Sequence, residues 1–235
     1  MEKGNMEITR GMFIEGGCDS EKLAWYDGVK ETDYISLLSL FARDKKPYWA
    51  AWALDKFGSV DIETCIDGNL TGDYFFHPGS VSVTGDILVN VEMMVGVDIR
   101  TSRKIRVNGD VWAGRDIRAG GNVRVVGKVH AGRDIRTKGD VRTEGSIRAG
   151  RGIRAERGIR AGEDIWTERE IWTGEGIYAV GNVLVGGDIR AKKGIHAGEI
   201  VRVNGNIESG GGIHAFRVMS GLKPENIVKG EWNQL

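Results

Sequence analysis

A repeat decides the fold of this 235-residue chain, and it is clearest in residues 115–154, which read RDIRAGGNVRVVGKVHAGRDIRTKGDVRTEGSIRAGRGIR. An aliphatic residue returns every sixth position in this stretch. The same spacing holds outward in both directions without exception, from Val81 to Ile213, at 23 positions. Chance does not produce such regularity, so the repeat is a structural unit. The 23 aliphatic positions are Val81, Ile87, Met93, Ile99, Ile105, Val111, Ile117, Val123, Val129, Ile135, Val141, Ile147, Ile153, Ile159, Ile165, Ile171, Ile177, Val183, Ile189, Ile195, Val201, Ile207 and Ile213.

Each six-residue unit reads as one short strand followed by a corner. A small or β-branched residue follows most of the aliphatics two positions later, which gives the strand two inward-pointing side chains. Gly, Asp, Asn, Lys and Glu fill the positions between strands, and these are residues of bends. The motif Arg115-Asp116-Ile117-Arg118 returns three units later as Arg133-Asp134-Ile135-Arg136, so three units make one coil. The sequence therefore predicts a mainly β fold, a three-sided parallel β-helix whose coil is three six-residue units long.

The net charge of zero conceals two parts of opposite sign. Residues 1–80 contain 8 basic and 14 acidic side chains, a net charge of −6, whereas residues 81–235 contain 25 and 19, a net charge of +6. The three prolines all lie outside 81–216, as expected where every backbone N–H is needed in a ladder. Composition therefore divides the chain into an acidic N-terminal capping region over 1–80, the β-helix over 81–216, and a C-terminal tail or edge cap over 217–235.

The N-terminal region is predicted to contain helices that cover one open end of the β-helix. Residues 33–41 read as a short helix, and Pro47 suits the first position of a second one that runs to Phe57. Trp49, Trp52 and Ala53 would share one face of that helix and belong to a core. An uncovered strand edge invites aggregation, so a cap is expected here. At the other end, a tail containing Ile227, Val228 and Trp232 would fold over the edge or hold a partner chain.

The order glycine, any residue, aliphatic, any residue, small residue resembles that of the bactofilins, the polymer-forming bacterial cytoskeletal family. The runs Gly109-Asp110-Val111, Gly139-Asp140-Val141 and Gly187-Asp188-Ile189 carry the resemblance, which covers residues 81–216. It implies a right-handed helix and self-assembly. The left-handed hexapeptide helices of acyltransferases follow a different order, which fails here at Ile147 and Arg151.

The residue after each aliphatic points outward, and three columns result from the three-unit period. The arginine face carries Arg100, Arg118, Arg136, Arg154, Trp172, Arg190 and Glu208. The histidine face carries Leu88, Arg106, Arg124, Arg142, Arg160, Tyr178, His196 and His214. The tryptophan face carries Met94, Trp112, His130, Arg148, Trp166, Leu184 and Arg202.

Arginines along the arginine face and its edge form a predicted binding strip for an acidic partner. Asp98, Asp116 and Asp134 offset part of the charge, but between residues 148 and 160 five arginines meet only Glu156, a net charge of +4. The alternative interpretation is a solvated sheet surface whose charges prevent aggregation. The predicted strip comprises Arg115, Arg118, Arg133, Arg136, Arg148, Arg151, Arg154, Arg157, Arg160 and Arg169.

A second candidate surface is apolar. Met94, Trp112, Trp166 and Leu184 form a stripe on the tryptophan face, which predicts either a protein interface or cover by a terminal segment. We predict no catalytic and no metal-binding residues. His196 and His214 would stack in adjacent coils, but no carboxylate or cysteine joins them.

These observations favour a non-enzymatic structural or interaction protein without a cofactor, which self-associates or docks a protein partner through its side-chain ladders. We expect a homo-oligomer. A phage or bacterial inhibitor or immunity-like protein that binds an acidic target is the alternative. A hexapeptide-repeat acyltransferase is disfavoured because an unbroken coil leaves no loop for a pocket, and nucleic acid is disfavoured because aromatics do not interleave with the arginines. No membrane span or signal peptide is evident, and two cysteines in no redox spacing favour the cytoplasm.

Overall fold

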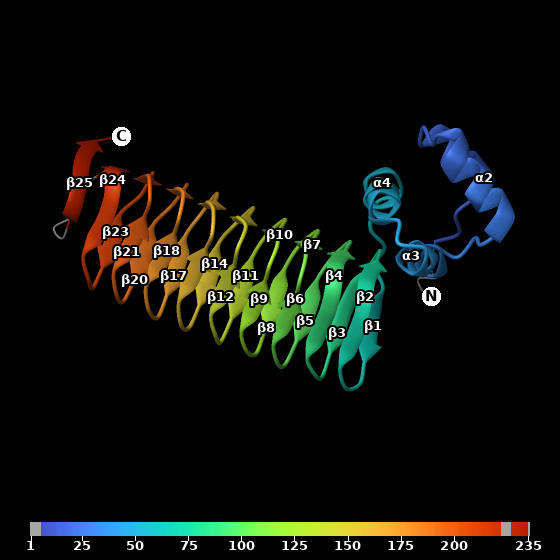
Figure 1. Ribbon diagram of the computed structural model, residues 1–235, viewed down its shortest axis with the longest axis horizontal. Coiled ribbons are helices and arrows are strands. Elements are labelled where there is room, and N and C mark those ends of the chain that lie inside the picture. Colours follow the sequence, from blue (N-terminus) through green and yellow to red (C-terminus); the bar gives the residue numbers. More distant parts are fainter. Residues whose placement is uncertain (1–5, 222–226, 235) are drawn as a thin grey trace.

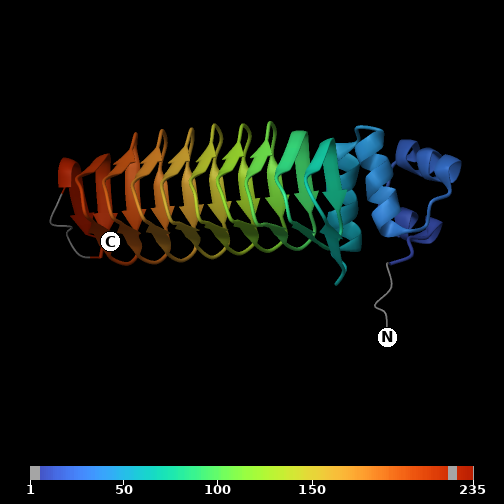
Figure 2. The same cartoon turned by 90° about the horizontal axis from the view of Figure 1, so that it is seen from below.

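The computed structural model describes residues 6–221 and the backbone of residues 227–234, and it forms a straight solenoid with a group of helices at its N-terminal end (Figures 1 and 2). Parallel strands stack with partners three six-residue units apart, such as Ile117 with Ile135 and Val129 with Ile147. The predicted β-helix, with three sides and three units in each coil, is therefore confirmed, as is the small helical region in front of it.

The arginine face is a separate nine-stranded sheet. Its strands are β1 (Glu63–Ile66), β3 (Ser80–Val83), β5 (Ile99–Thr101), β8 (Ile117–Ala119), β11 (Ile135–Thr137), β14 (Ile153–Ala155), β17 (Ile171–Thr173), β20 (Ile189–Ala191) and β23 (Ile207–Ser209).

The other two faces form one sheet because the long strands β4 and β24 each pair with strands of both faces. The histidine face contains β2 (Leu70–His77), β4 (Ile87–Val95), β6 (Ile105–Val107), β9 (Val123–Val125), β12 (Val141–Thr143), β15 (Ile159–Ala161), β18 (Ile177–Ala179), β21 (Ile195–Ala197) and β24 (Ile213–Ser220). The tryptophan face contains β7 (Val111–Ala113), β10 (Val129–Ala131), β13 (Ile147–Ala149), β16 (Ile165–Thr167), β19 (Val183–Val185) and β22 (Ile200–Val203).

The stacked sheets begin at Glu63, inside the region that composition assigned to the cap. In this first coil Thr64 pairs with Val81, one residue short of the usual period, and the pairing of β2 with β4 shifts between Gly72 and Tyr74. The first coil therefore departs from strict six-residue spacing, and the periodic pattern does not detect it.

The solenoid interior is filled by the repeating aliphatics, which are buried except for Ile207 in the last coil. The second inward position holds mostly Ala, Val or Thr. A threonine there has its hydroxyl satisfied: Oγ1 of Thr137 donates to the carbonyl of Gly121 and accepts the N–H of Gly139 at 3.0 Å. Polar side chains can therefore enter this narrow core without leaving an unpaired group.

Within the described residues, four helices form the helical cap: α1 (Arg10–Glu15), α2 (Ser20–Val29), α3 (Tyr34–Arg43) and α4 (Pro47–Phe57). The two predicted helices are α3 and α4, with Asp33 capping α3 and Pro47 opening α4. Trp49 and Ala53 are buried and Trp52 partly so, within an aromatic core completed by Phe13 and other rings. The first two helices were not foreseen, because α2 has no apolar stripe and buries only Tyr26.

The helical cap lies against the first coils of the solenoid. Helix α3 packs on β2, and α4 contacts β4. At the opposite end β25 (Ile227–Gln234) pairs with β24 and extends the sheet, while the side chains of Ile227, Val228 and Trp232 lie outside the described residues. Among the described helices, none has the length and apolarity needed to cross a bilayer.

Candidate docking site on the arginine face

A column of aspartates at the corner before strands β5, β8 and β11 holds this part of the arginine face in register. Oδ1 of Asp116 accepts the backbone N–H of Asp134 at 3.2 Å, and Oδ1 of Asp134 accepts that of Gly152 at the same distance, so each side chain bridges to the next coil. The second oxygen, Oδ2, pairs with the arginine two residues on, at 2.8 Å for Arg118 and 3.0 Å for Arg136. These aspartates thus stabilise the coil and neutralise the outward arginines.

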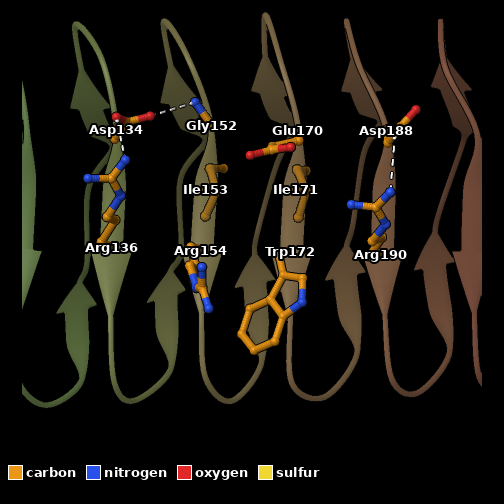
Figure 3. A pocket seen from close by; sticks show the side chains of 10 residues that line it. All are labelled: Asp134, Arg136, Gly152, Ile153, Arg154, Glu170, Ile171, Trp172, Asp188 and Arg190. Carbon is orange, nitrogen blue, oxygen red and sulfur yellow. Dashed lines mark hydrogen bonds and ion pairs between the residues drawn. The ribbon is translucent and has the colours of Figure 1, made fainter.

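The column breaks at Gly152, which occupies the position of an aspartate in the coils before it (Figure 3). Without a carboxylate at 152, Arg154 has no ion pair within the described residues. Its guanidinium instead lies 4.6 Å from the ring centroid of Trp172 in the next coil. A concavity of about 200 Å³ opens around this break, with Arg136 and Arg190 among its walls.

The concavity holds acidic as well as basic side chains. Asp134 and Asp188 are engaged with Arg136 and Arg190, whereas Glu170 has no ion pair in the described part of the chain. The site therefore presents a half-buried indole between guanidinium groups, which are side chains enriched at protein interfaces.

Arginine–aromatic stacking occurs on all three faces at the same level of the solenoid. Arg148 lies 4.5 Å from the ring centroid of Trp166 on the tryptophan face, and Arg160 lies 5.3 Å from that of Tyr178 on the histidine face. One coil with arginine at every outward position thus stacks against one coil with an aromatic residue at every outward position.

The structure brings part of the predicted arginine strip together. Arg118, Arg136 and Arg154 project from the arginine face, on β8, β11 and β14. The corner arginines form a column directly beside them, in which each backbone N–H donates to the carbonyl of the corner residue one coil earlier, at 2.8–2.9 Å. Within the described chain no ion pair neutralises this column, which comprises Arg115, Arg133, Arg151 and Arg169.

The remaining three arginines of the strip lie elsewhere. Arg148 and Arg160 belong to the other two faces. Arg157 sits at the far corner of the arginine face, 3.7 Å from carboxylate oxygens of both Asp140 and Glu175. The expectation that this stretch meets only Glu156 is therefore wrong, because carboxylates distant in sequence come from the coils on either side.

The apolar stripe is divided into two pairs of residues. Met94 is buried beneath the helical cap and Trp112 is partly buried beside it. Trp166 and Leu184 form a second, half-exposed pair further along the face. His130 and Arg148 separate the two pairs in the strand register.

Two of the histidines stack at the C-terminal end of the solenoid. The rings of His196 and His214 have centroids 4.5 Å apart, and burial together with the charge of His214 lowers the pKa of His196. The described residues contain no group of three or more histidine, cysteine or carboxylate side chains placed to hold a metal ion.

Sequence reasoning missed Gly152 as a feature of this site, although the signal was present. Aligning the chain at the three-unit period puts Gly152 in the column of Asp98, Asp116 and Asp134.

Comparison of the chain with protein-family models, curated proteins and solved structures gives no match.

Proposed function

We propose that this protein is a non-enzymatic β-helix scaffold that docks an acidic protein partner, or a second copy of itself, on the arginine face. The observation that carries the proposal is the break at Gly152, where Arg154 makes no ion pair within the described residues and stacks on Trp172. Trp and Arg are the residue types that contribute most to protein interfaces. A rigid sheet also holds them in place before binding, which lowers the entropic cost of association.

The charge of the surface favours an acidic partner. The corner column places arginine residues on backbones about 4.8 Å apart, the spacing of neighbouring strands, and like charges stacked at this spacing repel. A partner with carboxylates along its contact surface would relieve this repulsion. The association would then weaken as salt is added, because such interactions are screened over about 10 Å at 0.1 M ionic strength.

The bactofilin resemblance supports self-association as the second form of the proposal. Helix α3 covers the strand edge at β2, which favours a finite assembly over a filament growing from both ends. Sedimentation velocity across protein concentration and salt measures this directly. A monomer under every condition would contradict self-association and leave docking of a different protein.

Docking is tested with two probes of similar charge, poly-L-glutamate and a single-stranded DNA oligonucleotide. The variant Arg133→Glu, Arg151→Glu, Arg154→Glu reverses the strip, and Arg106→Glu, Arg124→Glu, Arg142→Glu on the histidine face is the matched control. We expect the first variant to weaken poly-L-glutamate binding by about tenfold or more and the control by much less. Equal losses in both variants would show general electrostatic attraction. Stronger binding of the oligonucleotide would favour nucleic acid over protein.

A further inference from the structure

A groove runs between helix α4 and the tryptophan face, at the junction of helical cap and solenoid. Its volume is about 580 Å³, within the range of pockets that hold small organic ligands. One wall comes from α4 and the floor from β4, β7 and β10. The groove is lined by Ala51, Leu54, Asp55, Glu92, Met94, Asp110, Val111, Trp112, Lys128 and His130.

The floor of the groove is an apolar and aromatic shelf. Met94, Trp112 and His130 are register partners in successive coils, so their side chains project side by side. The rings of Trp112 and His130 lie parallel, at an interplanar angle of 4° with centroids 6.1 Å apart. On the other side α4 presents Leu54, buried, and Ala51, exposed. The groove therefore has an apolar and aromatic floor against which the body of an organic ligand can pack.

The edge of the groove is negatively charged and poorly neutralised. Glu92 and Asp110 occupy the same corner position of adjacent coils, and both burial and the charge of Asp110 raise the pKa of Glu92. No lysine or arginine of the described chain makes an ion pair with either carboxylate. Asp55 adds a third carboxylate from α4, paired at 3.1 Å with Lys56.

The basic groups near the groove do not neutralise its excess of negative charge. Burial and the charge of Arg148 lower the pKa of His130, which favours the neutral form of its ring. Lys128 lines the groove but lies one coil beyond Asp110, whose Oδ1 accepts its backbone N–H at 2.7 Å. A cation placed beside Glu92 would therefore meet two carboxylates in a groove that an indole also lines.

We propose that this groove binds a small organic cation, with its apolar body on Trp112 and its ammonium group beside Glu92 and Asp110. Such a ligand offsets the repulsion between the two carboxylates. It also gains the attraction of a cation for an indole face, which is greatest for Trp among the aromatic side chains. The site is independent of the arginine face, which lies on another side of the solenoid.

The test compares phenethylamine, a primary ammonium on an aromatic body, with 3-phenylpropionate, an anion of similar size. Isothermal titration calorimetry should show binding of phenethylamine at least tenfold tighter than that of the anion. Glu92→Gln should weaken phenethylamine binding by about tenfold, and Trp112→Ala by a similar or larger factor. Trp166→Ala, a tryptophan on the same face outside the groove, is the matched control and should leave binding unchanged.

One further variant distinguishes a loss of binding from a loss of folded structure in Trp112→Ala. Ala51 is exposed on α4, so Ala51→Trp fills the groove while leaving the solenoid core intact, and it should abolish binding with an unchanged thermal unfolding curve. Equal affinity for the amine and the anion would overturn the proposal. So would an absence of phenethylamine binding to the unmodified protein, or a loss in Trp166→Ala equal to that in Trp112→Ala.

Discussion

The helical cap and the solenoid are stabilised in different ways. In the cap each contact is made once: the Phe13 ring stacks on Tyr26 with centroids 4.4 Å apart and meets Trp52 edge-on at 5.2 Å. In the solenoid the same contact is made in every coil, with Ile117, Ile135 and Ile153 aligned in one column. The stability of such a repeat is close to a sum over neighbouring coils. The cap depends on particular side chains, and the solenoid depends on its period.

Two deletions in the solenoid test its dependence on the period, and they should have the largest effect on folding. Deleting residues 115–132 removes one whole coil and joins Gly114 to Arg133, which restores the local sequence Gly-Arg-Asp-Ile-Arg at the junction. We expect this variant to fold and to unfold cooperatively. Deleting residues 115–131 instead shifts all later strands by one position and exchanges inward for outward side chains. We expect that variant to lose its folded structure, as measured by circular dichroism and thermal unfolding.

A solenoid that unfolded after deletion of residues 115–132 would contradict the additive description. The contacts of the coil removed, including the Arg118–Asp116 pair, would then be unique rather than repeated.

A smaller effect is expected from replacing glycine with alanine, which should lower the free energy of unfolding in the solenoid and raise it in the helical cap. A Cβ atom at Gly132 would lie 2.1 Å from the carbonyl oxygen of Gly114 in the coil before it, so Gly132→Ala forces the stacked corners apart. We expect a loss of about 1–3 kcal/mol in the free energy of unfolding, as for other overpacked sites. Gly28 lies in α2, where an added methyl group would meet no atom within 4 Å, and Gly28→Ala should stabilise the protein by up to about 1 kcal/mol.

Urea unfolding curves of both glycine variants measure whether each substitution lowers or raises the free energy of unfolding. If Gly132→Ala were neutral, the corner would be able to adjust locally, as it must where Glu168 occupies the equivalent position two coils later.

The smallest effect concerns His77, in the first coil beneath α3. The Nδ1 atom accepts the N–H of Gly79 at 3.0 Å, so Nε2 carries the proton and donates to Oγ1 of Thr64 at 2.8 Å. Burial lowers the pKa of His77 below its ordinary value of 6.5. As the pH falls through about 6.5 the unfolded chain binds protons that the folded chain does not, so the free energy of unfolding decreases.

The pH dependence of His77→Asn isolates this contribution, because an asparagine oxygen can still accept the N–H of Gly79. The variant should show a shallower loss of stability between pH 7 and pH 5 than the unmodified protein. Part of the slope should remain, since the pKa values of His130 and His196 are lowered as well. An identical slope in both proteins would show that His77 titrates alike in the folded and unfolded states.

The solenoid was predictable from sequence because its signal is repeated 23 times, so that coil length, inward positions and outward columns all follow from Val81 to Ile213. The first coil and helices α1 and α2 were not predictable in this way. Strand β1 and the first part of β2 lie out of the strict period, and α2 has no apolar stripe. The arginine face was foreseen, but the neutralisation of Arg157 by Asp140 and Glu175 was not, because those partners meet it only when coils stack.

The groove beside α4 could not be foreseen at all. Its floor residues Met94 and Trp112 were identified as outward and apolar, which is correct for the strand pattern. The wall, however, comes from Ala51 and Leu54, whose position depends on how the cap docks against the first coils. No local pattern in either segment encodes that packing.

The spacing of the corner arginines limits which kind of partner can match them. Its arginines are spaced at the strand separation of about 4.8 Å, whereas successive turns of an α-helix are about 5.4 Å apart. For a helix with one carboxylate per turn that lies along the column, the mismatch between carboxylates and arginines grows by about 0.6 Å per coil. After about four coils the mismatch is half of the strand separation. The column contains four arginines, and three coil steps separate Arg115 from Arg169. A helical partner can match it only over that length, whereas a partner built from stacked strands stays in phase along the whole rod.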